Sequence, residues 1–113
     1  MPTVRGNLYE LASQPGSGEN FTALLHCRNV VIERIVSSAA PEPLIYDQAQ
    51  DEWVLLLQGQ AVLEIAGDEM RLAPGDWLFI PAHTPHRVTA TSADPCCIWL
   101  AVHVHDSPAG GPP

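Results

Sequence analysis

Short runs of apolar and β-branched residues alternate with breaks that contain glycine or proline along most of the chain. These runs predict strands at residues 30–36, 51–57, 60–65, 76–80, 87–91 and 97–105. Strands this short, separated by Gly and Pro turns with little helix between them, indicate an antiparallel sandwich or barrel. The fold class we expect is therefore all-β.

The two ends of the chain carry different patterns. Phe21, Leu24 and Leu25 follow a Ser-Gly-Glu-Asn run at helical spacing, which predicts a short capped helix or turn that packs on the strands. Residues 106–113 are rich in Pro and Gly and should form a disordered tail. A chain of 113 residues is the size of one domain, so residues 1–105 should form a single unit.

The strand at 51–57 reads Trp-Val-Leu-Leu-Leu over residues 53–57, without polar alternation. Both of its faces must then be covered, one by the interior and the other by the N-terminal segment or a second subunit. Because exposed apolar patches usually mark interfaces, we expect a homodimer.

Composition narrows the classes of partner and location. A net charge of −8 opposes a phosphate backbone, so a nucleic acid is not expected as a partner. No apolar run is long enough to cross a bilayer, and the N-terminus lacks a secretory pattern, which favours a cytoplasmic protein. Cys27, Cys96 and Cys97 suit partly buried thiols better than a disulfide framework or a metal site.

Two ionisable residues lie where strand alternation would turn them inward. If Val54 and Leu56 face the interior, the period of two sends Glu52 the same way, and His86 precedes Val88 by the same spacing. A buried carboxylate must be paired, protonated or bound to metal. We therefore predict an enclosed polar pocket that contains Glu52 and His86 and binds a small molecule or a metal.

Around these residues the chain resembles the cupin superfamily. Its first motif reads G, five residues, HxH, three or four residues, E, six residues, G. In this chain Glu52 and Gly59 match the motif. Tyr46 and Gln48 stand at the two histidine positions, and Ala40 stands at the leading Gly. Its second motif reads G, five residues, PxG, two residues, H, three residues, N. Gly75, Pro81 and His86 match it, with His83 and Ala90 in place of the second Gly and the Asn.

The resemblance extends from about residue 7 to residue 105 and includes small bacterial cupins labelled mannose-6-phosphate-isomerase-like. It implies a double-stranded β-helix, the jelly-roll barrel of cupins, in which the motif ligands hold one divalent metal. Carried over by position, Glu52 and His86 remain as ligands, and Gln48 can offer its amide oxygen. This oxygen-rich set would suit Zn, Mn, Fe or Ni and leave positions open for substrate.

Four further residues are candidates for the same pocket. Tyr46 could move a proton as a catalytic residue beside Glu52 and His86, and His83 could do the same or bind substrate. His103 could be a third ligand, but the last strand has apolar residues on both faces, so its direction stays open. Arg34 could bind a substrate carboxylate or phosphate, or pair with a nearby acid.

Two functions fit this set of residues. The first is a metal-assisted isomerase, epimerase or lyase that acts on a small sugar-like or carboxylated molecule. The alternative is a non-catalytic module that binds or senses a small ligand without metal, which the loss of the two motif histidines favours. An iron dioxygenase would need more histidines around the metal than His86 alone.

Overall fold

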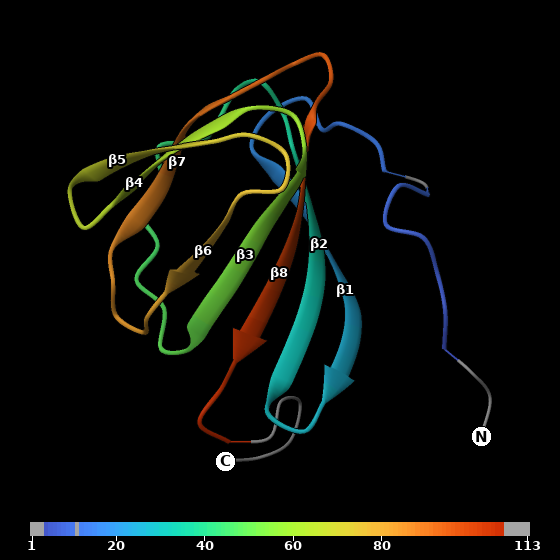
Figure 1. Ribbon diagram of the computed structural model, residues 1–113, viewed down its shortest axis with the longest axis vertical. Helices are drawn as coiled ribbons and strands as arrows, with labels where there is room; N and C mark the ends of the chain where they lie inside the picture. Colours follow the sequence, from blue (N-terminus) through green and yellow to red (C-terminus); the bar gives the residue numbers. More distant parts are fainter. Residues whose placement is uncertain (1–3, 11, 108–113) are drawn as a thin grey trace.

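The computed structural model describes residues 4–10 and 12–107, and these residues form two antiparallel sheets. The larger sheet has the order β1-β2-β8-β3-β6 and the smaller one the order β5-β4-β7 (Figure 1). The strands are β1 (Glu19–Cys27), β2 (Val30–Ser37), β3 (Asp51–Gln58), β4 (Ala61–Ile65), β5 (Asp68–Leu72), β6 (Trp77–Ile80), β7 (His86–Thr91) and β8 (Cys97–Val104). The prediction of an all-β fold is confirmed.

One predicted element is wrong. Phe21, Leu24 and Leu25, expected in a short capped helix or turn, belong to strand β1 at the edge of the larger sheet. This strand pairs with β2 from Glu19 opposite Ser37 to Cys27 opposite Val30. Strand β5 was not predicted at all. No helix occurs in the part of the chain that the structure describes, and therefore none that could cross a membrane. Residues 108–113 of the expected tail lie outside the described residues.

The hydrophobic core lies between the two sheets. Leu56 of β3 and Trp99 of β8 are fully buried and meet Leu63 and Leu72 of the smaller sheet. The buried positions along β3 are every second residue, as expected for a strand with one face on the core. Glu52 occupies the first of these positions, so the core pattern itself carries a carboxylate into the interior.

Gly59, the last residue of the first cupin-like motif, has a structural reason for its identity. It follows β3 with φ of 92°, and a Cβ there would lie 2.7 Å from Sγ of Cys97. Only glycine combines that backbone conformation with so close an approach. The turn after β3 is thereby fixed, and the register of β4 with it.

Candidate functional site

Glu52 and His103 lie side by side on the interior face of the larger sheet. The register pairs Glu52 with His103, Val54 with Ala101 and Leu56 with Trp99. Because β3 turns Val54 and Leu56 into the core, its neighbour β8 must turn Ala101 and His103 the same way. The direction of His103, which the sequence left open, is therefore inward.

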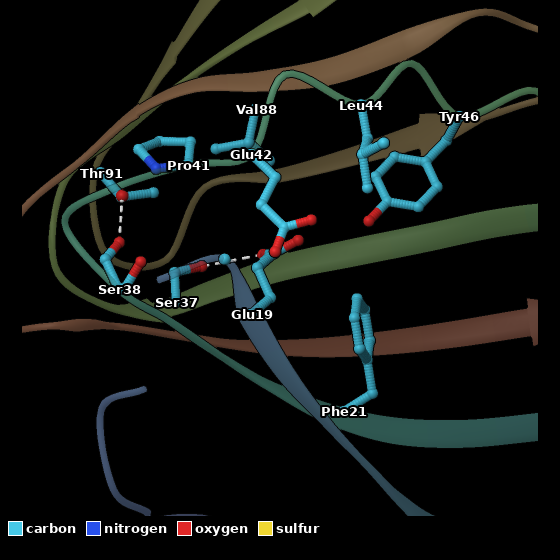
Figure 2. Close-up of a pocket in the computed structure, with 11 residues that line it drawn as sticks. Glu19, Phe21, Ser37, Ser38, Pro41, Glu42, Leu44, Tyr46, Val88 and Thr91 are labelled. Carbon is cyan, nitrogen blue, oxygen red and sulfur yellow. Dashed lines mark hydrogen bonds between the residues drawn. The ribbon is translucent and has the colours of Figure 1, made fainter. Parts of the chain in front are cut away.

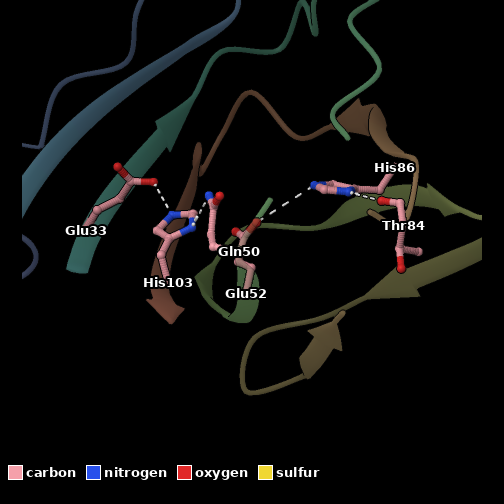
Figure 3. Close-up of polar contacts among 6 residues, drawn as sticks. All are labelled: Glu33, Gln50, Glu52, Thr84, His86 and His103. Carbon is pink, nitrogen blue, oxygen red and sulfur yellow. Dashed lines mark hydrogen bonds and ion pairs between the residues drawn. The ribbon is translucent and has the colours of Figure 1, made fainter. Parts of the chain in front are cut away.

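His86 faces Glu52 from the other sheet. It is the first residue of β7, and Nε2 of its ring lies 3.8 Å from Oε1 of Glu52 (Figure 3). Both side chains are buried, with 8% and 7% of their surface exposed. The separation is longer than a hydrogen bond and leaves room for an atom bound to both groups.

A backbone carbonyl fixes the tautomer of His86. Nδ1 lies 2.9 Å from the carbonyl oxygen of Thr84 and must donate to it, because a carbonyl only accepts. In the neutral ring, Nε2 then presents a lone pair toward Glu52. The same arrangement orients histidines that bind metals, where the second ring nitrogen is held by a carbonyl or carboxylate.

Burial governs the acidity of Glu52. Desolvation raises the pKa of its carboxyl above the ordinary value of 4.5, and the charge of Glu33 raises it further. The charges of His103 and His86 and a hydrogen bond from Gln48 lower the pKa, but do not cancel the effect of burial. Glu52 therefore holds a proton more readily than an exposed glutamate, unless a cation binds beside it.

His103 belongs to a separate chain of polar contacts. Its Nε2 donates to Oε1 of Glu33 at 2.8 Å, and Nδ1 accepts from the amide of Gln50 at 3.2 Å (Figure 3). Burial alone would lower the pKa of His103, but the hydrogen bond to Glu33 and the charges of Glu52 and Glu33 outweigh it and raise the pKa. Both ring nitrogens are engaged, so His103 has no free lone pair for a metal.

Tyr46 and Gln48 reach the site from the segment before β3. Tyr46 exchanges two backbone hydrogen bonds with His86, and the two rings stack with their centroids 5.7 Å apart. Oε1 of Gln48 is buried among the described residues without a hydrogen-bond partner. Burial raises the pKa of Tyr46, followed by the charge of Glu19, so its hydroxyl stays protonated.

Two of the predicted site residues lie outside the pocket. His83 has φ of 58° in the turn before β7, its side chain is 72% exposed, and Nδ1 lies 3.3 Å from Oδ1 of Asp47. Arg34 lies on the outer face of β2, since its neighbours Glu33 and Ile35 face inward, and it donates to the carbonyl oxygens of Leu8 and Glu10. Arg34 therefore holds the N-terminal segment against β2 and does not face the pocket where a ligand would bind.

The structure adds two acids that the sequence did not single out. Glu19 of β1 and Glu33 of β2 line a cavity of about 50 Å³ together with Glu52, His86 and His103, which we call the site cavity. An adjoining cavity of about 140 Å³ shares Glu19, Phe21, Tyr46 and Val88 with it. Predicting β1 as a strand paired with β2 would have turned Glu19 inward.

The donors around Glu52 suit a cation held by three ligands. His86, Glu52 and Gln48 line the site cavity together, with Nε2 of His86 3.8 Å from Oε1 of Glu52 and with Oε1 of Gln48 buried without a hydrogen-bond partner in the described part of the chain. Among the described residues, no group of three or more His, Cys, Asp or Glu side chains has the geometry for a metal. The set therefore depends on Gln48, and it would leave several coordination positions open.

Comparisons with known proteins agree with this architecture. The family model of the cupin domain matches residues 33–103. A crystal structure from Ralstonia eutropha JMP134, which carries a provisional mannose-6-phosphate isomerase name, is 41% identical, with a TM-score of 0.81 over 92% of this chain and 99% of that one. No functionally curated protein matches the chain.

Two solved structures of lower identity share the fold. A cupin superfamily protein from Desulfitobacterium hafniense DCB-2 is 23% identical, with a TM-score of 0.76 over 94% of this chain and 95% of that one. The TT1209 protein from Thermus thermophilus is 21% identical, with a TM-score of 0.80 over 91% and 98% of the two chains. Because the family model of the cupin domain matches more than half of the chain, the chain belongs to the cupin family.

Proposed function

We propose that this cupin is an isomerase, epimerase or lyase that holds a divalent cation in the site cavity and a small sugar-like or carboxylated substrate across the site cavity and the adjoining cavity. The observation that carries the proposal is that Glu52, His86 and Gln48 line one buried cavity, in which His86 faces Glu52. The provisional isomerase name of the Ralstonia protein supports the same class of reaction.

Each residue has a definite role in this proposal. Glu52, His86 and Gln48 would hold the cation, which supplies polarisation of a substrate carbonyl when bound. Tyr46, stacked on His86 and protonated, donates a hydrogen bond or its proton to a substrate oxygen. The apolar walls, Val54, Leu63 and Ile80 among them, limit access of water to the polar groups.

Metal uptake tests the proposal without an assay of activity. We expect Mn²⁺, Zn²⁺, Fe²⁺ or Ni²⁺ to raise the melting temperature of the wild-type protein, and elemental analysis to find the metal at one ion per chain. Glu52→Gln and His86→Asn should lose both effects. Because Glu52→Gln also removes a buried charge, the metal-induced shift is the quantity to compare, not the melting temperature itself.

Matched controls lie on the surface. His83→Asn changes an exposed histidine in the turn before β7, close in sequence to His86. Glu69→Gln changes an exposed acid of β5. Both variants should keep wild-type metal uptake. Retention of stoichiometric metal by Glu52→Gln would overturn the ligand assignment. A separate measurement tests the reaction itself: deuterium exchange into a carbonyl-containing sugar, catalysed by the wild-type protein, would report the proton transfer directly.

A metal-free binding module is the second candidate. The hydrogen bonds made by both ring nitrogens of His103 favour this module, because His86 is then the only histidine among the described residues of the site cavity that could bind a cation. In that case Gln48 and Glu52 would hydrogen-bond the ligand directly within an apolar pocket. Protein that is metal-free as purified and shows no thermal shift with the four ions would support this function over the first.

We also propose that the protein is a homodimer. Trp77 and Phe79 of β6 are 59% and 53% exposed, and the ring of Trp77 lies 6.0 Å from that of Trp53 on the outer face of β3. These aromatic side chains lie at one edge of the larger sheet, where a second copy of the chain would cover them.

A further inference from the structure

The walls of the site cavity and the adjoining cavity are rich in carboxylates. Glu19, Glu33 and Glu52 line the site cavity, and Glu42 lines the adjoining one. Figure 2 shows the carboxylates of Glu19 and Glu42 turned toward the same space, beside the hydroxyl of Tyr46. The charge of Glu42 is one of the causes that raise the pKa of Glu19, in keeping with this arrangement. A ligand in this space meets several carboxyl groups, whose oxygens accept hydrogen bonds.

Among the described residues, no side-chain cation other than histidine faces either cavity. The chain has five arginines and no lysine. Arg34 binds backbone carbonyls on the outer face, Arg71 pairs with Glu69, Arg87 pairs with Glu64, and Arg5 and Arg28 are exposed. None of the five lines the two cavities.

The hydrogen-bond donors of the walls are also largely spent on the protein. Ser37 donates to Glu19 at 2.8 Å, Ser38 donates to the carbonyl oxygen of Ala40 at 3.1 Å, and Thr91 donates to the carbonyl oxygen of Ser38. The N–H groups of His86 and His103 are likewise directed to Thr84 and Glu33. Apart from the hydroxyl of Tyr46, what the walls offer a ligand is therefore mainly the acceptor oxygens of their carboxyl groups.

A phosphate or carboxylate does not fit such walls, because it is itself an acceptor and carries the same sign of charge. Hydroxyl groups do fit, because each can donate to a carboxylate or amide oxygen. The aromatic rings of Phe21 and Tyr46, which line both cavities, supply an apolar face for the carbon skeleton.

We infer that the ligand of this pocket is an uncharged, hydroxyl-rich small molecule without phosphate or carboxylate groups. This inference rests on the proposed function and narrows its substrate class. Under this inference the ligand is not a sugar phosphate such as the mannose 6-phosphate in the provisional name of the Ralstonia protein, although the two chains are 41% identical.

Binding of matched sugar pairs tests the inference. D-mannose and D-fructose are each compared with their 6-phosphates by calorimetry, with protein that is metal-free and protein loaded with Mn²⁺. We expect the dissociation constant of each free sugar to be at least about tenfold lower than that of its phosphate, since like charges across an interface are strongly disfavoured. Glu19→Gln with Glu42→Gln should narrow this ratio, and Glu69→Gln should leave it unchanged.

The outcomes separate this inference from the proposed function. Equal or tighter binding of either 6-phosphate would overturn the inference, and so would the failure of both free sugars to bind. Preference for the free sugar in metal-free protein, with no uptake of metal, would uphold the ligand class and overturn the metal-dependent function. An unchanged ratio in the double variant would show that these two carboxylates do not set the selectivity, contrary to the inference.

Discussion

The indole of Trp99 donates a hydrogen bond of 2.9 Å to the hydroxyl of Ser37, and both side chains are buried. Ser37 in turn donates to Glu19. Ser37→Ala would leave the indole N–H buried without an acceptor, which costs about 1–3 kcal/mol. We expect urea unfolding to show a loss of stability in this range, with Ser17→Ala, at an exposed position, within about 0.5 kcal/mol of wild type. Equal effects of the two substitutions would contradict this role of Ser37.

Leu56 is the largest aliphatic contribution of β3 to the core and has no exposed surface. Leu56→Ala should therefore lower the free energy of unfolding by about 2–5 kcal/mol, because it removes buried methyl groups and leaves a cavity. Leu25→Ala, on the exposed edge strand β1, is the matched control and should cost much less. Denaturant unfolding of both variants checks the difference. A loss of similar size at the two positions would mean that the core is not centred on β3.

Glu19 should make stability depend on pH. Burial raises its pKa above 4.5, against the hydrogen bond from Ser37 that lowers it, and the charges of Glu52, Glu33 and Glu42 raise it further. A raised carboxyl pKa contributes stability below the unfolded value, and this contribution is lost as pH rises through the folded value.

Glu19→Gln should therefore raise the melting temperature at pH 7 to 8, and the gain should shrink as pH falls toward 4.5, where wild-type Glu19 is itself protonated. The amide oxygen of the variant can still accept from Ser37. Thermal unfolding of both proteins across this pH range is the measurement. A gain that grows on acidification would have the wrong sign.

The proposed dimer depends on the aromatic residues of β6. Trp77→Ser with Phe79→Ser should shift the protein to a monomer in sedimentation velocity, because it removes exposed apolar surface from one edge of the larger sheet. Leu25→Ser changes the opposite edge and should leave the association unchanged. A wild-type protein that sediments as a monomer at high concentration would rule out the dimer.

Much of the fold could be predicted because its strands are apolar and end at Gly or Pro. Strand β1 was mistaken for a helix for a specific reason: its register with β2 shifts between Ala23 and Leu25. Leu24 is the extra residue of this bulge and has no partner on β2, so the period of two is interrupted there. Phe21, Leu24 and Leu25 then imitate a helical spacing. Strand β5 escaped prediction because only Leu72 of its five residues is buried.

The site could be predicted only in part, because sequence shows alternation within a strand but not pairing between strands. Alternation was enough to turn Glu52 inward. The direction of His103 needed its pairing with Glu52, and the outward direction of Arg34 needed the interior position of Glu33. The unpartnered oxygen of Gln48 and the engagement of both nitrogens of His103 are properties of contacts that no spacing encodes.

The two walls of the site cavity differ in how their backbones are held. Glu52 and His103 lie on β3 and β8, each paired on both sides within the larger sheet. Tyr46 and Gln48 lie on a connecting segment that is held locally, by the isolated bridge between Tyr46 and His86 and by a hydrogen bond from the N–H of His83 to the carbonyl oxygen of Gln48. Substitutions in residues 39–50 can therefore reshape that side of the cavity without disturbing the sheet. Cupins with the same central strands can in this way diverge in the ligands they accept, by exchange of a single loop.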